Sequence, residues 1–385
     1  MPVSLTTPNP LIKYFLFTII LCLFCPKLRA QHDPDFDSLI LAWGPTEKYP
    51  YRDSIRTPEI YHGKDFSIKL AHESSGFATK TKVLKNPYNR NLFSRKAYPL
   101  SYSLIYQGHI VALFEPGLFN CFNVVDLERN PELEDLLNTR NFKSHFLMDG
   151  RLYGITTKGK WFVFDNNRWR KTEEKLVPPK KRTFLYNDSD YLVYNECFGE
   201  WGGTVYFYHR ESGQTFFTEA TCANTVQKKT EGYLVLSELG HMGGTTDLQL
   251  IPDPSQLSNL DEFENVKRTI KAIGYSDSTN HAQQLFDFWG IMNFSMFEVE
   301  GQDYYLTYWG QRTFLTQMDE ETYVIMDPLF NDEIFMHNPI TTKYPTGEVL
   351  INFSHWSTSG EREVAVLLIQ GKRITKIRWN KKRSY

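Results

Sequence analysis

Six short turns rich in Gly, Asn and Asp recur along the chain, and each stands directly before a run of alternating apolar residues. They read "YQGH", "MDGR", "YNDSD", "KTEG", "EGQD" and "PTGE", at Gly108, Gly150, Asp188, Gly232, Gly301 and Gly347. These residue types are favoured where a tight turn requires positive φ. A strand, a polar or glycine-bearing loop and a second strand follow each turn, so the sequence predicts a series of β-hairpins.

The spacing of these hairpins constrains the fold further. First strands are expected to start near Phe66, Ile110, Leu152, Tyr191, Tyr233, Tyr304 and Val349. Their intervals are roughly 39 to 45 residues, with one of roughly 71, and a period of about 40 to 45 residues made of strands is typical of propeller blades.

Two helices are expected among the strands. The segment "LSNLDEFENVKRTIKAIG", residues 257–274, carries an apolar face with acidic residues early and basic residues late, which predicts a helical insertion around residues 252–290. This insertion accounts for the long interval. A shorter helix is expected at "NPELEDLL", where Asn130 is a capping residue and Pro131 occupies the first helical position.

On these grounds residues 35 to 379 resemble a β-propeller, an all-β fold, of about seven blades, with six or eight as alternatives. The resemblance implies a closed ring of sheets around a central channel, with the two chain ends meeting in one blade. Gly-His occurs at Gly108-His109 and Gly240-His241, but the later Trp-Asp of WD40 blades does not, and no kelch pattern runs through all units. A flat sandwich or two smaller β domains remain alternatives.

The first thirty residues have the pattern of a secretory signal peptide. Lys13 precedes an apolar run from Tyr14 to Cys25, and a polar exit ends at Ala30-Gln31. We therefore expect residues 1–30 to be removed and residues 31–385 to form a single domain that is secreted or periplasmic. An uncleaved anchor, or a lipid on Cys25, is the alternative. No later run reaches the roughly 20 apolar residues of a membrane span.

The net charge bears on nucleic-acid binding, and the cysteine content bears on disulfide formation. The 43 Lys and Arg balance 45 Asp and Glu, for a net charge of −2, which gives no global footprint for nucleic acid. Cleavage would leave Cys121, Cys197 and Cys222. Cys197 and Cys222 are close enough in sequence to be the candidate disulfide, and the alternative is that all three are buried thiols.

Two neighbouring units share a loop motif, "ECFGEWGGT" from Glu196 and "ELGHMGGTT" from Glu238. Residues that recur with the fold usually serve the fold. We assign the glycines to tight loop geometry and the two glutamates to hydrogen bonds with loop amides. This structural set comprises Glu196, Glu238, Gly202, Gly203, Gly243 and Gly244.

The residues that differ between the two loops are the candidates for function. When the two loops are aligned with a one-residue slip, Glu200 occupies the same position as His241, and Trp201 follows Glu200 in the sequence. Corresponding loops of other units would complete one mouth of the channel. The candidate ligand-binding set is Glu200, Trp201, His241, Trp309, Arg312, His355 and Trp356. Flat aromatic rings beside charged groups suit a sugar.

These features favour an exported, non-enzymatic binding propeller whose loop-lined mouth holds a glycan or another extracytoplasmic ligand, including an exported protein. One alternative is a polysaccharide hydrolase or lyase that uses Glu200 and His241, and another is a protein-interaction scaffold. The sequence contains no phosphate-binding loop, no Cys-x-x-Cys after residue 30 and no His-Glu-x-x-His. We therefore assign no catalytic residue, metal or cofactor.

Overall fold

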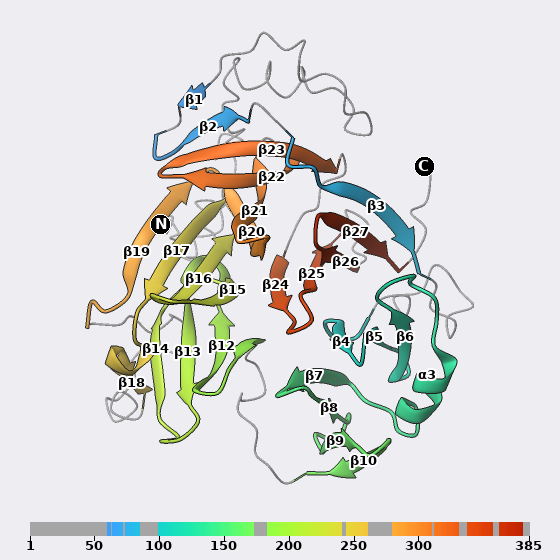
Figure 1. Ribbon diagram of the computed structural model, residues 1–385. Helices are drawn as coiled ribbons and strands as arrows, with labels where there is room; N and C mark the ends of the chain where they lie inside the picture. The colour runs from blue at the N-terminus through green and yellow to red at the C-terminus, as the bar shows by residue number, and fades with distance from the viewer. Residues whose placement is uncertain are drawn as a thin grey trace, which may run out of the picture.

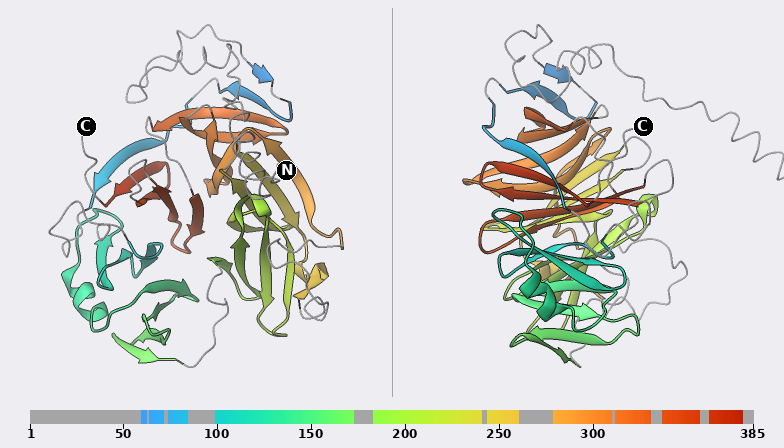
Figure 2. Two further views of the ribbon diagram at one scale, coloured as in Figure 1. Left: turned by 180° about the vertical axis from the view of Figure 1, so that it is seen from behind. Right: turned by 90° about the vertical axis from the view of Figure 1, so that its right-hand side faces the viewer.

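The chain forms a six-bladed β-propeller in the computed structural model, which describes residues 60–62, 64–71, 74–84, 99–172, 183–240, 244–260, 279–309, 312–330, 337–356 and 362–379. Six antiparallel sheets stand around a central axis, and Figure 1 looks down that axis. The side view shows the sheets packed face against face (Figure 2). The sequence favoured seven blades and gave six as an alternative, and six is the observed number.

Blades are numbered I to VI along the chain, and in each the first strand is innermost. Blade I contains β4 (Leu104–Tyr106), β5 (His109–Phe114) and β6 (Leu118–Asn123). Blade II contains β7 (Ser144–Met148), β8 (Arg151–Ile155), β9 (Trp161–Asp165) and β10 (Arg168–Lys171). Blade III contains β11 (Thr183–Asn187), β12 (Tyr191–Cys197), β13 (Gly203–His209) and β14 (Thr215–Glu219).

The second half of the ring repeats this order. Blade IV contains β15 (Ala223–Lys229), β16 (Gly232–Leu239), β17 (Thr245–Ile251) and β19 (Gln283–Trp289). Blade V contains β20 (Met292–Val299), β21 (Gln302–Trp309), β22 (Arg312–Asp319) and β23 (Thr322–Phe330). Blade VI contains β24 (His337–Lys343), β25 (Val349–Trp356), β26 (Arg362–Gln370) and β27 (Arg373–Arg378).

Strands from the N-terminal part of the chain close the ring at its outer edge. After β1 (Ile60–His62), β2 (Ser67–Leu70) pairs in parallel with β23 of blade V. Next, β3 (Ala78–Val83) pairs in parallel with β27, the last strand of blade VI (Figure 1). Strands from the N-terminal and C-terminal parts of the described chain, β3 and β27, therefore meet in blade VI, as the resemblance implied for the chain ends. The predicted strand at Phe66 is this outer addition and not a blade of its own.

The long interval between the strand starts at Tyr233 and Tyr304 contains an excursion of the chain within blade IV, between β17 and β19. After β17, a 3-10 turn at Pro254–Gln256 leads to β18 (Ser258–Asn259), which pairs with β14 of blade III before β19 returns to blade IV. The helix predicted at residues 257–274 is wrong at its start, where Ser258 and Asn259 form β18, and its residues 261–274 lie outside the described residues.

The six turns of the sequence pattern all connect the first and second strands of a blade, so they lie on one face of the ring, called the turn face below. Ion pairs on this face join neighbouring blades. Asp149 pairs with Arg210, Lys228 with Asp188 and Asp190, and Lys229 with Glu298 and Asp303. Loops between second and third strands lie on the opposite face, called the loop face.

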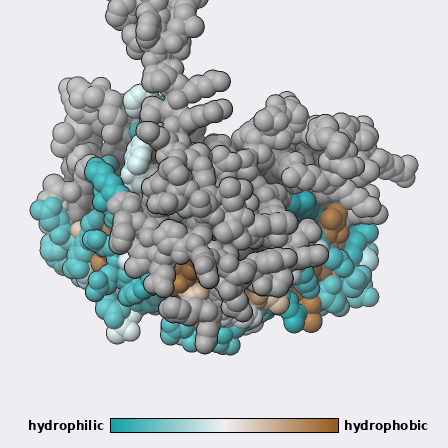
Figure 3. Space-filling model, turned by 90° about the horizontal axis from the view of Figure 1, so that it is seen from above, coloured by the Kyte–Doolittle hydropathy of each residue, from teal (hydrophilic) through white to brown (hydrophobic). Residues whose placement is uncertain are grey.

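Each pair of neighbouring blades has its own apolar core. The clusters contain large aromatic and aliphatic side chains, for example Phe297, Tyr304 and Phe353 between blades V and VI. Seen from above, the described surface is mainly hydrophilic (Figure 3). Blades II and III have the smallest of these cores, and it consists of Met148, Tyr153, Val163 and Leu192.

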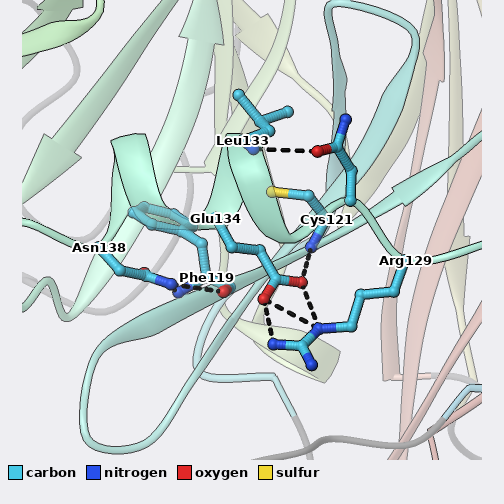
Figure 4. Close-up of polar contacts among 7 residues, drawn as sticks. Phe119, Cys121, Arg129, Leu133, Glu134 and Asn138 are labelled. Carbon is cyan, nitrogen blue, oxygen red and sulfur yellow. Dashed lines mark hydrogen bonds and ion pairs between the residues drawn. The ribbon is translucent and has the colours of Figure 1, made fainter.

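Blade I has three strands, and a helix replaces the fourth. The predicted helix is present as α3 (Pro131–Leu137), with the Asn130 side chain accepting a hydrogen bond from the Leu133 amide. Glu134 accepts a hydrogen bond from the Cys121 amide at 3.0 Å and is paired with Arg129 (Figure 4). Asn138 bonds both the amide and the carbonyl of Phe119. Side chains of α3 thus satisfy the outer edge of β6, which would otherwise be open to strand pairing.

Candidate functional site

A cavity of about 520 Å³ occupies the central channel. Its walls come mainly from first strands, which are β4 and the segment before it, β7, β11 and β24, with additions from β8, β9 and β25. This volume lies within the range of roughly 300–1,000 Å³ that is usual for small-molecule sites. The thin core between blades II and III leaves room for it there.

Aromatic side chains form much of the cavity wall. Phe146 stacks on Tyr153 at 5.2 Å between ring centroids and meets Trp161 edge-on at 5.4 Å. The aromatic residues that line the cavity and are only half-buried are Tyr102, Phe146, Trp161, Phe184 and Tyr186. Half-buried rings on a concave surface offer flat apolar faces to a ligand.

A buried histidine determines whether one hydroxyl group in the cavity donates or accepts a hydrogen bond. His145 is buried, and burial lowers its pKa to about 4, although the hydrogen bond with the Val111 carbonyl acts in the opposite direction. The imidazole is therefore neutral at pH 7. Nε2 lies 3.1 Å from the Val111 carbonyl oxygen, which can only accept, so Nε2 carries the proton.

The other ring nitrogen of His145 must then accept. Nδ1 lies 2.8 Å from Ser101 Oγ, so the Ser101 hydroxyl donates to it. Ser101 also lines the cavity, and its oxygen keeps lone pairs that can accept a hydrogen bond from a ligand. The pair thus presents an oriented acceptor to the cavity.

The charged residues of the cavity are unevenly placed. Lys143 precedes β7 at the loop-face end, and Lys343 ends β24 at the turn-face end. Asp149 is the only acidic residue among the described residues that line the cavity, and Arg210 holds it with two hydrogen bonds of 3.0 and 2.7 Å. Lys343 lies 3.6 Å from Glu298.

The loop between β12 and β13 lies on the loop face, and two of the predicted ligand-binding residues are exposed there. Glu200 and Trp201 belong to a 3-10 turn, Gly199–Trp201, between β12 and β13. The Trp201 side chain is 65 % exposed. Neither residue lines the central cavity.

Among the remaining predicted residues, Trp309 is the one whose side chain the structure describes. Trp309, at the end of β21, is 7 % exposed and packs in the apolar core between blades IV and V. His241 lies outside the described residues. Arg312, His355 and Trp356 lie in β22 and β25, and their side chains are also outside the described part.

The two glutamates of the loop motif are not equivalent in the ring. Each is opposite a threonine in its hairpin, since Glu196 pairs with Thr204 and Glu238 with Thr246. However, Leu192, on the same face of β12 as Glu196, packs against blade II, whereas Leu236, on the face of Glu238, packs against blade V. Because a one-residue shift reverses the face of a strand, the two glutamates point toward different neighbouring blades, while the pairing of Glu200 with His241 stays a prediction.

Their surroundings differ accordingly. Glu196 is half-buried and accepts a hydrogen bond from the Tyr206 hydroxyl at 3.2 Å. Glu238 is 4 % exposed, and among the described residues its Oε2 has no hydrogen-bond partner. Burial raises the pKa of Glu238 to about 8.

The other residues assigned to structure occupy constrained positions. Gly202 has φ of +93°, and a Cβ at Gly203 would lie 2.6 Å from the Ala220 carbonyl oxygen. Gly244 also has positive φ, and Gly243 is outside the described residues. Cys197 and Cys222 form a disulfide that joins the end of β12 to the segment before β15, and Cys121 is a buried free thiol.

We expect Trp201→Ala to leave stability nearly unchanged. An indole that is 65 % exposed contributes little core burial, so the change in unfolding free energy should stay within about 0.5 kcal/mol. Thermal and urea unfolding of the variant measure it. A loss of roughly 3 kcal/mol or more, as for a core aromatic, would show that Trp201 packs against the blade.

Comparisons with known proteins assign the chain to no family. No family model matches it, and neither does any curated protein. Similar solved structures include YjhT, at 8 % identity, TM-score 0.39 and coverage of 72 % of this chain and 97 % of that one. A putative 6-phosphogluconolactonase from Bacteroides fragilis NCTC 9343 has 14 % identity, TM-score 0.34 and coverage of 67 % and 76 %.

A third similar structure is the extracellular domain of a putative hybrid two-component system from B. thetaiotaomicron. It has 12 % identity and TM-score 0.32, with coverage of 74 % of this chain and 46 % of that one. Similarities of this size carry no information about a ligand or an activity of this chain. Within the described ranges, no helix is long and apolar enough to cross a membrane.

Proposed function

We propose that the protein is exported and binds a glycan in its central cavity. A propeller fold supports a binding or scaffold role, and the cavity favours binding. The observation that carries the proposal is the wall of half-buried aromatic rings, interrupted by the hydroxyl groups of Ser101, Ser144 and Thr183. Sugars have apolar ring faces that stack on aromatic side chains and hydroxyl groups that need hydrogen-bond partners.

The oriented Ser101 oxygen supports a ligand that carries hydroxyl groups. Because Ser101 donates its proton to His145, its oxygen can serve a ligand only as an acceptor. An alcohol group can donate to it, whereas an ether or a carbonyl cannot. This requirement matches a polyol better than an apolar ligand.

Export is supported by two features. The N-terminal pattern is that of a signal peptide, and the Cys197–Cys222 disulfide is typical of proteins in an oxidising compartment. We propose cleavage after Ala30, with residues 31–385 as one domain. N-terminal sequencing of protein recovered outside the cytoplasm tests this step, and intact chain in the cytoplasm would refute it.

The site itself is tested with a matched pair of tryptophan variants. A panel of neutral and uronate-containing oligosaccharides is screened by calorimetry, and the strongest binder is titrated into Trp161→Ala and Trp201→Ala. We expect Trp161→Ala to lose about tenfold or more in affinity, because Trp161 lines the cavity, and Trp201→Ala to bind normally.

Each other outcome has a definite meaning. Loss of binding in Trp201→Ala alone would place the site on the loop face, as the sequence suggested. Binding that neither variant weakens would remove the cavity from the proposal, and no binding across the panel would refute glycan recognition. Because Trp161→Ala removes a half-buried ring, its unfolding curve is recorded as well.

A further inference from the structure

We infer that the ligand is an acidic saccharide, whose carboxylate is held at the loop-face end of the cavity by Lys143. This inference rests on the proposed function and specifies the class of ligand. It comes from the charges that line the cavity and from where each charge lies along the channel.

The cavity carries positive charge in a protein that is slightly negative overall. The whole chain has a net charge of −2, whereas the cavity is lined by two lysines and one aspartate. That aspartate, Asp149, is already neutralised by Arg210, and its Oδ1 also accepts a hydrogen bond from Asn187 at 3.2 Å. His145 is neutral, so it adds no charge.

The two ends of the cavity differ. At the turn-face end, Lys343 lies 3.6 Å from Glu298, and the same carboxylate bonds Lys229 at 2.8 Å. Positive and negative groups alternate there. At the loop-face end, no acidic residue is found among the described residues that line the cavity, and Lys143 is the charged group.

The neighbours of Lys143 complete a site for an anionic sugar. Its amide donates to the Ile155 carbonyl oxygen at 2.8 Å, which fixes the backbone at the start of β7. Ser144 and Thr183 supply hydroxyl groups at the same end, and Trp161 supplies a flat ring. A carboxylate can accept from the ammonium and from hydroxyl groups while the sugar ring stacks on the indole.

The test compares tri-galacturonate with the uncharged tri-galactose, two probes of the same ring stereochemistry in which a carboxylate replaces the hydroxymethyl group at C6. We expect wild-type protein to bind the acidic probe roughly five- to tenfold more tightly at low salt, and this preference to shrink near 0.5 M salt as the charges are screened. Lys143→Met, which keeps an unbranched chain of similar length, should abolish the preference, so that the variant binds the two probes with equal affinity.

Two lysine variants serve as controls. Lys80→Met removes the same charge from the outermost strand of blade VI, and it should keep the preference. Lys343→Met should weaken it less than Lys143→Met, because Lys343 already has an acidic neighbour.

Equal binding of both probes by the wild type, or a preference that survives Lys143→Met, would overturn the inference while leaving glycan binding intact. If neither probe nor any neutral oligosaccharide of the panel binds, glycan recognition itself fails and this inference fails with it. Unfolding curves of the lysine variants verify that each is folded at the assay temperature.

Discussion

Glu134→Ala should destabilise the protein by on the order of 3 kcal/mol. Glu134 is 2 % exposed, and its carboxylate contacts both the Cys121 amide and the Arg129 guanidinium. Its carboxylate accepts from the Cys121 amide, pairs with the Arg129 guanidinium and lies on the helix that covers the edge of β6. Alanine would leave the amide without a partner at the outer edge of blade I. Urea unfolding measures the loss.

Two further variants separate the causes. Glu132→Ala removes an exposed acidic residue from the same first turn of α3, so it should change the unfolding free energy by no more than about 0.5 kcal/mol. Glu134→Gln keeps an oxygen acceptor for the Cys121 amide but loses the ion pair, and we expect an intermediate loss. Equal stability of Glu134→Ala and wild type would mean that the helix does not hold the edge of blade I.

The six turns predicted the architecture more accurately than the strand starts did. Each turn, from Gly108 to Gly347, lies between the first and second strands of one blade. Five of the six turns contain a glycine with positive φ. Phe66 also follows a segment with Gly and Asp, "HGKD" at residues 62–65, and this segment joins β1 to β2 in an antiparallel pair outside the six blades. Its strand, β2, is an edge addition to blade V, and counting it as a unit gave seven blades in place of six.

The site was harder to predict because the first strand of each blade leaves a weak signal. The strands β4, β7 and β11 are three to five residues long and stand before the turns that mark the hairpins. Their side chains reach one cavity only because the ring closes, which is a long-range consequence of topology. Trp161 lines this cavity, and the proposed function gives it the ligand-stacking part that the sequence analysis assigned to the loop tryptophans.

The similarity of the two loop sequences does not determine how their residues are placed in the ring. Similarity between "ECFGEWGGT" and "ELGHMGGTT" does not fix which face of the strand a residue occupies, since a shift of one position reverses it. Glu196 and Glu238 therefore face different neighbours, and only Glu238 is fully buried. A chemical role cannot be transferred from one loop to the other by alignment.

The burial of Glu238 makes the folding stability depend on pH. Burial raises its pKa to about 8 from the ordinary value near 4.5, so the folded protein keeps the proton over a range in which the unfolded chain releases it. The stability that the protonated group contributes is fully present below about pH 4.5 and is lost as the pH rises through about 8. Asp247 adds to this trend, because burial and the nearby charges of Asp287 and Glu219 raise its pKa to about 7.

Glu238→Gln should therefore be more stable than wild type at pH 8, by on the order of a few kcal/mol, and close to wild type near pH 4.5. Glutamine has nearly the same shape as the protonated acid but does not ionise, so the difference isolates the titration from the packing. Urea unfolding at several values between pH 4.5 and 8.5 measures it, and adding Asp247→Asn should flatten the remaining slope up to about pH 7. Parallel stability curves for wild type and Glu238→Gln would mean that Glu238 is ionised in the folded protein, and that a positively charged or donating group satisfies its carboxylate between blades IV and V.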